Sequence, residues 1–451
     1  MTFFKHFVTN NKISVANNYR ENFRIAAPVI LSLAGQSVVQ IADSVMVGRT
    51  GAVPLAAVSF AGAVITNIMV IGLGLTIGLT PVAGMHWARS EFRRVSGYFQ
   101  NSLSLNLFFS LLLVAILFAL IPLLPLLGQP EEVTSLMNEY YIMVSISLIP
   151  MMIFLTGKQF LEGIGNTHIS MYITLIANLI NIFLNYLFIY GKLGFPVMGI
   201  DGAGLATLIS RLLMPVMLLV LINKKEGYRR FLNMFRIAHF SVKEHLHLIK
   251  IGLPISGQMV IEFFSLSAIT FMMGWMGTKS LAANQIVQTM INFTFMIANG
   301  VAAASTILVS HSAGKGNLSE ARTRGFTGIK LSTIIMGTAA LIFLLFGESI
   351  ALLFTSDKEV TAIAVKIFYV VALFELFDGL QVTALGALRG LTDTKKPMFL
   401  AIFSYLFISL PVAYIGGFVL KLGEAGLMSG FAFGLLVASI LFIRRFSKLT
   451  K

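Results

Sequence analysis

The feature that most constrains the fold of this chain is a series of long apolar runs that come in two matching sets. Twelve runs are each long enough to cross a hydrocarbon layer of about 30 Å as a helix, and charged residues, glycine or proline bound them. Laying Pro28 on Pro254 aligns the start of the two halves without a gap and places Gly48 on Gly274. The predicted spans lie near residues 25–47, 53–83, 101–127, 138–161, 169–190, 202–222, 249–273, 281–309, 328–354, 361–388, 397–420 and 425–443. The sequence therefore predicts an all-α integral membrane protein with twelve transmembrane helices, in two pseudo-symmetric six-helix lobes around a central cavity.

Composition supports this fold class and argues against several others. Hydrophobic residues make up 57% of the chain and charged residues 12%, a balance that no soluble globular class shows. The apolar runs are continuous over about twenty residues rather than alternating over about ten, which argues against a β-barrel. The chain has no cysteine, which excludes disulfides and thiolate metal sites, and no P-loop motif, which argues against ATP-driven transport.

The runs also set the predicted organisation and orientation. They define an amino-terminal segment 1–24, an N-lobe 25–222, a polar linker 223–248, a C-lobe 249–443 and a carboxy-terminal tail 444–451. With twelve spans both ends lie on one side, and that side collects twenty-four lysines and arginines against five on the other. The positive-inside rule then predicts that both termini are cytoplasmic. The same asymmetry explains the net charge of +14 without a nucleic-acid partner.

Several carboxylates fall inside these runs, where a charge is expensive, and four of them are candidates for a functional site. Glu262 lies eight residues after Pro254, about 12 Å into its helix, and Asp43 lies in the outer third of the first span. Glu375 and Asp378 lie three residues apart in the tenth span. A charge at such a depth costs about 2.5–3.5 kcal/mol on insertion scales, so it indicates a function. A buried carboxylate can hold a proton or bind a hard cation such as Na⁺.

Amide side chains accompany the acids at helical spacing, so that each set shares one face of its helix. A lone amide can serve as an interhelical hydrogen bond, whereas a stripe that ends on a carboxylate indicates a water-filled cavity. For Glu375 a cavity position and a helix contact both stay open. The side chains predicted to line the cavity are Gln36, Gln40, Gln258, Gln285, Gln288, Asn292 and Glu375.

Catalysis is not expected. The seven histidines all fall in predicted terminal or loop regions, and none lies in mid-span beside a serine or a carboxylate. Glu162 is expected to pair with Lys158, one turn earlier, in a structural role. The chain is therefore not predicted to be an enzyme.

Several motifs together resemble the multidrug and toxic compound extrusion (MATE) family, in its NorM-type bacterial branch. In the first span, Pro28 precedes Asp43 by fifteen residues. Asp43 lies in the segment IADSVMVGRTGAVPLAA, residues 41–57. LEGIGNT follows the fourth span and ALRGLTDTKKP follows the tenth, similar to the paired cytoplasmic turns of that family. Together with the duplicated twelve-span layout, the resemblance covers about residues 20–445.

The resemblance implies a secondary active antiporter of the bacterial inner membrane, embedded in lipid as a monomer. It would export amphipathic cationic drugs and dyes by alternating access in exchange for Na⁺ or H⁺, and would need no cofactor besides this coupling ion. The resemblance implies a cation site in the C-lobe, binding Na⁺ as its metal, at Glu262 and Asp378. It implies a coupling site in the N-lobe at Asp43, Asn181, Asn185 and Thr207. Phe374 is assigned to the cavity, where some NorM-type members have a tyrosine, and this departure leaves the choice between Na⁺ and H⁺ open.

Two other functions stay open. A lipid-linked oligosaccharide flippase of the same superfamily would share this architecture but would favour a cationic cavity that holds pyrophosphate. The intramembrane charges here are mainly acidic, with Arg211 in the sixth span as the exception. A membrane enzyme would need a catalytic histidine or serine set inside a span.

Overall fold

The computed structural model describes residues 15–235 and 240–451, and over these ranges the chain is helical with short connections. Twelve helical segments in this part of the chain are long and apolar enough to span a membrane, which confirms the predicted number. Residues 1–14 of the predicted amino-terminal segment and 236–239 of the predicted linker lie outside the described residues. Large apolar side chains such as Phe108, Leu179 and Leu345 are exposed, as a lipid-facing surface requires.

Six spans come from each half of the chain. The first six are α2 (Val15–Gly48), α3 with α4 (Ala52–Ile77, Leu79–Ala88), α5 with the 3-10 helix η1 (Phe92–Leu120, Ile121–Leu127), α7 with α8 (Asn138–Ile146, Leu148–Gly163), α9 (His168–Tyr190) and α10 (Ile200–Lys224). The second six are α12 (Val242–Met276), α13 (Thr278–Gly314), α14 (Leu318–Phe354), α15 (Lys358–Gly390), the series α16, η3, α17 and η4 (Lys395–Ile402, Phe403–Ser409, Leu410–Tyr414, Ile415–Val419) and α18 (Gly423–Leu449). The short helix α6 (Glu131–Leu136) precedes α7, and α11 (Glu226–Asn233) lies between the halves, inside the predicted linker.

Several helices extend well beyond the predicted spans. α5 begins at Phe92 rather than near 101, α14 at Leu318 rather than near 328, and α12 at Val242 rather than near 249. The added turns are polar or charged, so a hydropathy criterion does not include them in a span. They nevertheless continue the helical hydrogen bonding outside the apolar layer. At the start of α12, the Ser241 side chain caps the helix by accepting a hydrogen bond from the backbone N–H of Glu244.

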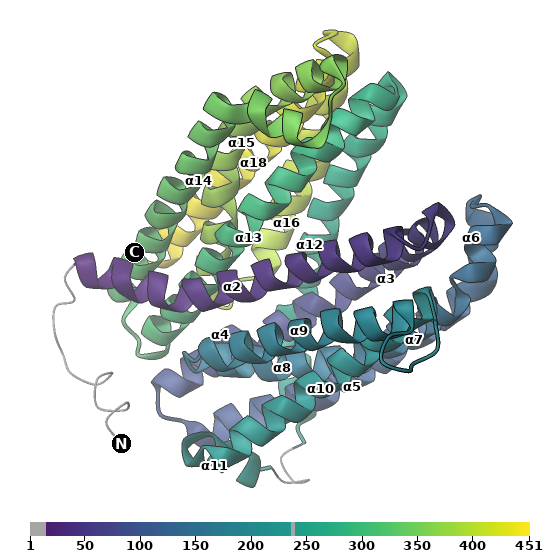
Figure 1. Cartoon of the computed structure of the whole chain (residues 1–451). Coiled ribbons are helices and arrows are strands. Elements are labelled where there is room, and N and C mark those ends of the chain that lie inside the picture. Colours follow the sequence, from purple (N-terminus) through teal and green to yellow (C-terminus); the bar gives the residue numbers. More distant parts are fainter. Residues whose placement is uncertain (1–14, 236–239) are drawn as a thin grey trace.

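The helices pack into two lobes that meet at one end and diverge toward the other (Figure 1). The C-lobe, α12 to α18, has one apolar core that includes Phe374 and Phe431. The N-lobe has two cores, around Phe160 and around Tyr141. The start of α2 and the end of α18 lie where the lobes meet (Figure 1), and we call this the joined end and the opposite one the divergent end.

The first helix of each lobe packs part of its length on the other lobe. Ile25, early in α2, lies in an apolar cluster with Val301 of α13, whereas later parts of α2 pack on α9. In the same way, Ser256 of α12 donates a hydrogen bond of 2.6 Å to the backbone carbonyl of Ile71 in α3. The two lobes are therefore connected by helix crossings rather than by the linker alone.

Glycines allow the lobes to touch at the joined end. A Cβ atom on Gly74 of α3 would collide with the backbone of Ser256, and one on Gly84 of α4 would collide with the hydroxyl of Ser310. Because α12 and α13 belong to the C-lobe, these contacts hold lobe against lobe. They close the joined end of the molecule.

The prediction that the histidines lie in terminal or loop regions is wrong for those in the described ranges. His86 lies in α4, His168 begins α9, His245 and His247 lie in α12, and His311 lies in α13. His311 is buried where the lobes meet, and its Nε2 makes a hydrogen bond of 2.7 Å with the backbone carbonyl of Gly163. The error has one cause: the helices continue past the apolar runs.

Candidate functional site

In the N-lobe, a hydrogen-bonded chain surrounds Asp43 of α2. Its Oδ1 accepts a hydrogen bond of 2.5 Å from Asn185 Nδ2, which also donates to Asn181 Oδ1 at 3.1 Å. Asn181 Nδ2 in turn donates to Ser210 Oγ at 3.3 Å, and Ser210 donates to the backbone carbonyl of Thr207. Asn181 and Asn185 are one turn apart on α9, so they present adjacent amides to α2 and α10. The structure thus places the four predicted N-lobe residues together, with Thr207 contributing through its backbone.

A cation lies beside this network. Arg211, near the middle of α10, donates a hydrogen bond of 2.8 Å from Nη1 to Ser147 Oγ, and it interacts electrostatically with Asp43 and Tyr140. The N-lobe site therefore contains one acid and one base.

In the C-lobe, Glu262 of α12 is linked to an arginine through an amide. Gln258 Nε2 donates a hydrogen bond of 2.6 Å to Glu262 Oε2, and Arg389 Nη2 donates one of 2.6 Å to Gln258 Oε1. Arg389 lies in ALRGLTDTKKP, the motif after the predicted tenth span, but α15 continues to Gly390 and the guanidinium reaches back to Gln258 in the lobe. Gln258 is buried at 2% exposure and serves as this bridge.

Two further acids on α15 have unused hydrogen-bonding capacity. Glu375 is fully buried and its Oε1 accepts a hydrogen bond of 2.9 Å from Thr294 of α13. Asp378, at 3% exposure, interacts electrostatically with both Glu375 and Glu262. Glu375 Oε2, Asp378 Oδ2 and both polar atoms of Gln381 are buried without a hydrogen-bond partner in the described part of the chain. Glu375 therefore makes a helix contact and also faces Asp378, so the two interpretations left open by the sequence are compatible.

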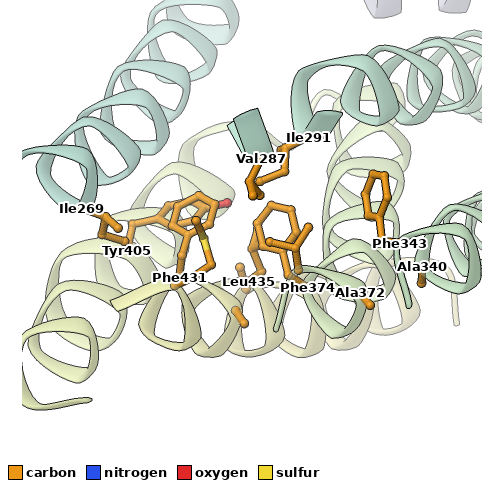
Figure 2. Packing of buried hydrophobic residues seen from close by; sticks show 14 of the residues in the cluster. Ile269, Val287, Ile291, Ala340, Phe343, Ala372, Phe374, Tyr405, Phe431 and Leu435 are labelled. Atoms are coloured by element: carbon orange, nitrogen blue, oxygen red, sulfur yellow. The ribbon is translucent and has the colours of Figure 1, made fainter. Parts of the chain in front are cut away.

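Tyr405 is a member of this site that the sequence analysis did not identify. It lies in η3, a π-helical segment of the eleventh span, and its ring stacks on Phe431 with centroids 5.8 Å apart (Figure 2). Its hydroxyl lies in the electrostatic neighbourhood of Glu262 and Asp378 but has no hydrogen-bond partner of good geometry among the described residues. The sequence did contain one signal for it, because Tyr405 places a hydroxyl in the middle of an apolar span, next to Ser404. Segments of π-helix frequently occur at functional sites.

The residues predicted to line the cavity have different exposures. Gln40, Gln285 and Asn292 are exposed and Gln36 is partly exposed. Gln288, at 8% exposure, is buried, as are Gln258 and Glu375. Phe374 is a correction: at 1% exposure it packs on Phe431 inside the C-lobe core rather than presenting its face to an open surface (Figure 2). Phe374 lies on α15, which packs on α13, α14 and α18, so its ring is covered by side chains of its own lobe and is not accessible to a ligand.

The described residues contain no group of three or more His, Cys, Asp and Glu side chains that could hold a metal ion. A cation in the C-lobe would therefore depend on a mixture of carboxylate, amide and hydroxyl oxygens, which hard cations accept. The separate pair of Lys158 and Glu162 forms as predicted, with 3.7 Å between Nζ and Oε1.

Comparison with known proteins connects this architecture to a family. The MatE family model matches residues 28–187 and 254–415, which are the two repeated halves. A probable multidrug resistance protein NorM of Rhodopseudomonas palustris is 32% identical over 435 residues, covering 96% of this chain and 92% of the relative. The corresponding protein of Bacillus licheniformis is 29% identical over 427 residues, covering 94% of each chain.

Solved structures share the fold. The Vibrio cholerae MATE transporter VcmN in its bent form superposes with a TM-score of 0.87 at 19% identity, covering 97% of this chain and 98% of the other. The eukaryotic MATE transporter AtDTX14 gives a TM-score of 0.85 at 16% identity, covering 97% and 100%. Because the family model covers both halves, and a relative above 30% identity extends over nearly the whole length, this chain belongs to the MatE family.

Proposed function

We propose that the protein is an efflux antiporter of the bacterial inner membrane, which exports amphipathic organic cations in exchange for Na⁺ or H⁺. The observation that carries the proposal is the excess of acids inside the C-lobe, where Glu262, Glu375 and Asp378 lie close to one another and an arginine, Arg389, interacts with Glu262 alone among them. The relatives' designation as multidrug resistance proteins supports the same class of substrate.

The imbalance explains why an ion would enter. Glu375 and Asp378 are buried and Glu262 is partly buried, so the three carboxylates cannot all stay ionised without a large desolvation penalty, and a proton or a cation has to compensate them. The free oxygens of Asp378 and Glu375, with the Gln381 amide and the Tyr405 hydroxyl nearby, are the donors that Na⁺ prefers. These residues would hold the coupling ion, which crosses the membrane as a transported substrate.

The N-lobe and the divergent region would receive the exported compound. Asp43 is partly exposed and can attract a cationic group, and the exposed amides Gln40, Gln285 and Asn292 can orient its polar edges. With the lysine- and arginine-rich ends cytoplasmic, the divergent end faces outward, so this conformation would release drug and accept the ion. Ion binding would then favour opening of the joined end, where Gly74 and Gly84 hold the lobes together.

The flippase alternative receives less support from the charges. Arg211 and Arg389 are both intramembrane cations, as pyrophosphate binding would require, but each has an acid in its electrostatic neighbourhood. Neither lobe therefore offers a net positive pocket.

Ethidium export from proteoliposomes tests the proposal, with a sodium gradient and a proton gradient imposed separately. We expect one of the gradients to drive export by the unmodified protein and Glu262→Gln to abolish it. Glu359→Gln is the matched control, because Glu359 is a C-lobe carboxylate whose side chain is 71% exposed. The absence of export under both gradients would overturn the proposal, and full activity of Glu262→Gln would overturn the C-lobe assignment.

A further inference from the structure

The end of α10 and the start of α11 form a groove that neither polar site of the lobes explains. It is open to the surface and has a volume of about 490 Å³. Its lining residues are Val216, Leu219, Val220, Asn223 and Lys224 of α10 and Arg229 of α11. The groove thus lies at the start of the linker, on the side of the membrane to which the excess of lysines and arginines assigns the cytoplasm.

The apolar wall of this groove is continuous with the lipid-facing surface of the N-lobe. Leu212, Val216, Leu219 and Val220 follow one another at helical spacing on one face of α10, and all four are exposed. Because α10 is a membrane span, an exposed apolar face on it contacts acyl chains. An acyl chain that follows this face arrives directly at the groove.

The same face ends on two positive charges. Lys224 follows Val220 by one turn of α10, and Arg229 reaches the groove from α11. Both side chains are exposed, and within the described ranges neither forms an ion pair with a carboxylate. Glu226, the acid between them in the sequence, is also exposed and pairs with neither. The groove therefore presents two uncompensated cations beside an apolar wall.

α11 is fixed to the N-lobe, so the place of Arg229 is defined. Phe231 is fully buried, and its backbone carbonyl accepts a hydrogen bond of 2.7 Å from the hydroxyl of Ser96 in α5. The hydroxyl of Tyr228 accepts one of 2.5 Å from Asn166 Nδ2. Arg229, between these two anchored residues, is left exposed at the groove. The groove is thus formed before any molecule enters it.

We propose that this groove binds one anionic phospholipid of the cytoplasmic leaflet, with its phosphate between Lys224 and Arg229 and an acyl chain along Val216 and Leu219. The charge selects an anionic lipid, because a zwitterionic headgroup brings a cation that two positive side chains repel. The apolar wall selects a lipid over a free phosphate, which gains nothing from these side chains. Binding here does not depend on which compound or ion the protein transports.

Native mass spectrometry of the purified full chain tests the site. The probes are phosphatidylglycerol, which is anionic, and phosphatidylcholine with the same acyl chains, which is zwitterionic. We expect the chain to retain one phosphatidylglycerol at concentrations at which it does not retain phosphatidylcholine. Replacing both cations, Lys224→Gln with Arg229→Gln, should raise the Kd for this lipid about thirtyfold, because both charges act on one phosphate.

A matched double variant separates the groove from a general attraction to basic surface. Arg93→Gln with Lys225→Gln removes two exposed charges on the same side of the membrane that do not line the groove. It makes the same change in net charge and should leave the Kd for phosphatidylglycerol almost unchanged. Equal losses of affinity in the two double variants would overturn the site.

A second measurement locates the acyl chain. Because the chain has no cysteine, a fluorophore can be attached to a single introduced cysteine, Leu212→Cys, on the lipid-facing side of α10. In nanodiscs of phosphatidylcholine with a minor fraction of brominated phosphatidylglycerol, it should be quenched more than the same label at Phe108→Cys, an exposed position in the middle of α5. Replacement of both groove cations should abolish this difference.

The remaining outcomes each decide the proposal. Equal retention of the two lipids by the unmodified protein, or equal quenching at the two labels, would overturn it. Retention of glycerol phosphate as tightly as phosphatidylglycerol would show a site for a free anion and would overturn the lipid assignment. Selective retention of phosphatidylglycerol, lost only with the two groove cations, supports it even if no dye is exported under any gradient.

Discussion

The polar sites of the two lobes differ in how completely their hydrogen-bonding groups are used. In the N-lobe, a continuous chain runs from Asp43 through Asn185 and Asn181 to Ser210, and one amide oxygen, Asn185 Oδ1, is left unpaired. In the C-lobe, Asp378 and Glu375 each keep one buried oxygen that has no hydrogen-bond partner among the residues the structure describes. Buried polar atoms are normally paired, so the C-lobe is the site that an added ion or proton would complete.

The charge balance differs in the same sense. Asp43 interacts with one arginine, Arg211, whereas in the C-lobe three acids lie close together and only Glu262 interacts with an arginine, Arg389. The lobes share a repeated scaffold, yet the acids are at non-equivalent positions, since Glu262 aligns with Gln36. One scaffold can therefore support a nearly neutral substrate subsite in one lobe and a strongly acidic ion site in the other.

The largest expected effect comes from removing the charge of Asp378. Asp378→Asn should lower ion-driven dye export more than about 100-fold and abolish ion binding, because it removes a buried charged partner. Asp43→Asn should lower export of cationic dyes about tenfold but preserve ion binding in the C-lobe. Export from proteoliposomes, with calorimetry for Na⁺ and a pH-sensitive dye for H⁺, measures both effects. If both variants lose ion binding equally, the functional difference between the lobes does not exist.

A steric change at the joined end should have the next largest effect. Gly74→Ala places a methyl group against the backbone of Ser256 and should destabilise this conformation by about 1–3 kcal/mol. Gly62→Ala, in the same helix, is the control, because a Cβ there meets nothing within 4 Å. Since the chain has no cysteine, two introduced cysteines can carry spin labels that report the distance between the lobes at the divergent end. Indistinguishable distance distributions for the two variants would contradict the role assigned to Gly74.

A smaller effect is expected at Tyr405. Tyr405→Phe removes one hydroxyl from the ion site and should weaken ion affinity about five- to tenfold, while export at saturating ion stays near normal. Tyr414→Phe is matched to it, because Tyr414 lies in the same span but is 51% exposed. Calorimetric titration of both variants is the measurement. Unchanged affinity in Tyr405→Phe would remove this residue from the C-lobe site.

The smallest effect is expected for Glu91, an acid that lies outside the membrane spans, so its substitution is a reference for substitutions of the buried acids. The hydrogen bond with His86, at 2.5 Å, lowers the pKa of Glu91 below its ordinary value of 4.5, and Arg94 adds to the shift. A lowered pKa means that the ionised form stabilises the fold above pH 4.5 and that this contribution disappears as the pH falls through the shifted value. Glu91→Gln should therefore lower the Tm slightly at pH 7, and this difference should disappear as the pH is lowered through the shifted pKa of Glu91. A Tm difference that persists at the lower pH would contradict this assignment.

Much of the site was predictable because burying a charge in lipid leaves a strong sequence signal. Glu262, Asp378 and Asp43 stand out in apolar runs, and Asn181 and Asn185 share a helical face that the spacing alone reveals. Arg389 and Tyr405 were missed for a different reason. Arg389 is an ordinary basic residue after an apolar run, and the hydroxyl of Tyr405 is only a weak polar signal inside one, so packing alone reveals that both lie near Glu262.

The sequence by itself determined the number of spans, their duplication and the presence of intramembrane acids. Length, hydropathy and charge are properties of each segment alone, and the bilayer imposes its requirements on each spanning segment separately. Only the tertiary structure decided which polar atoms are satisfied. It placed Phe374 in the core, Arg211 opposite Asp43 and a π-helical Tyr405 near Glu262. These pairings join residues far apart in the chain, and the side-chain packing between helices fixes them in ways that no single span encodes.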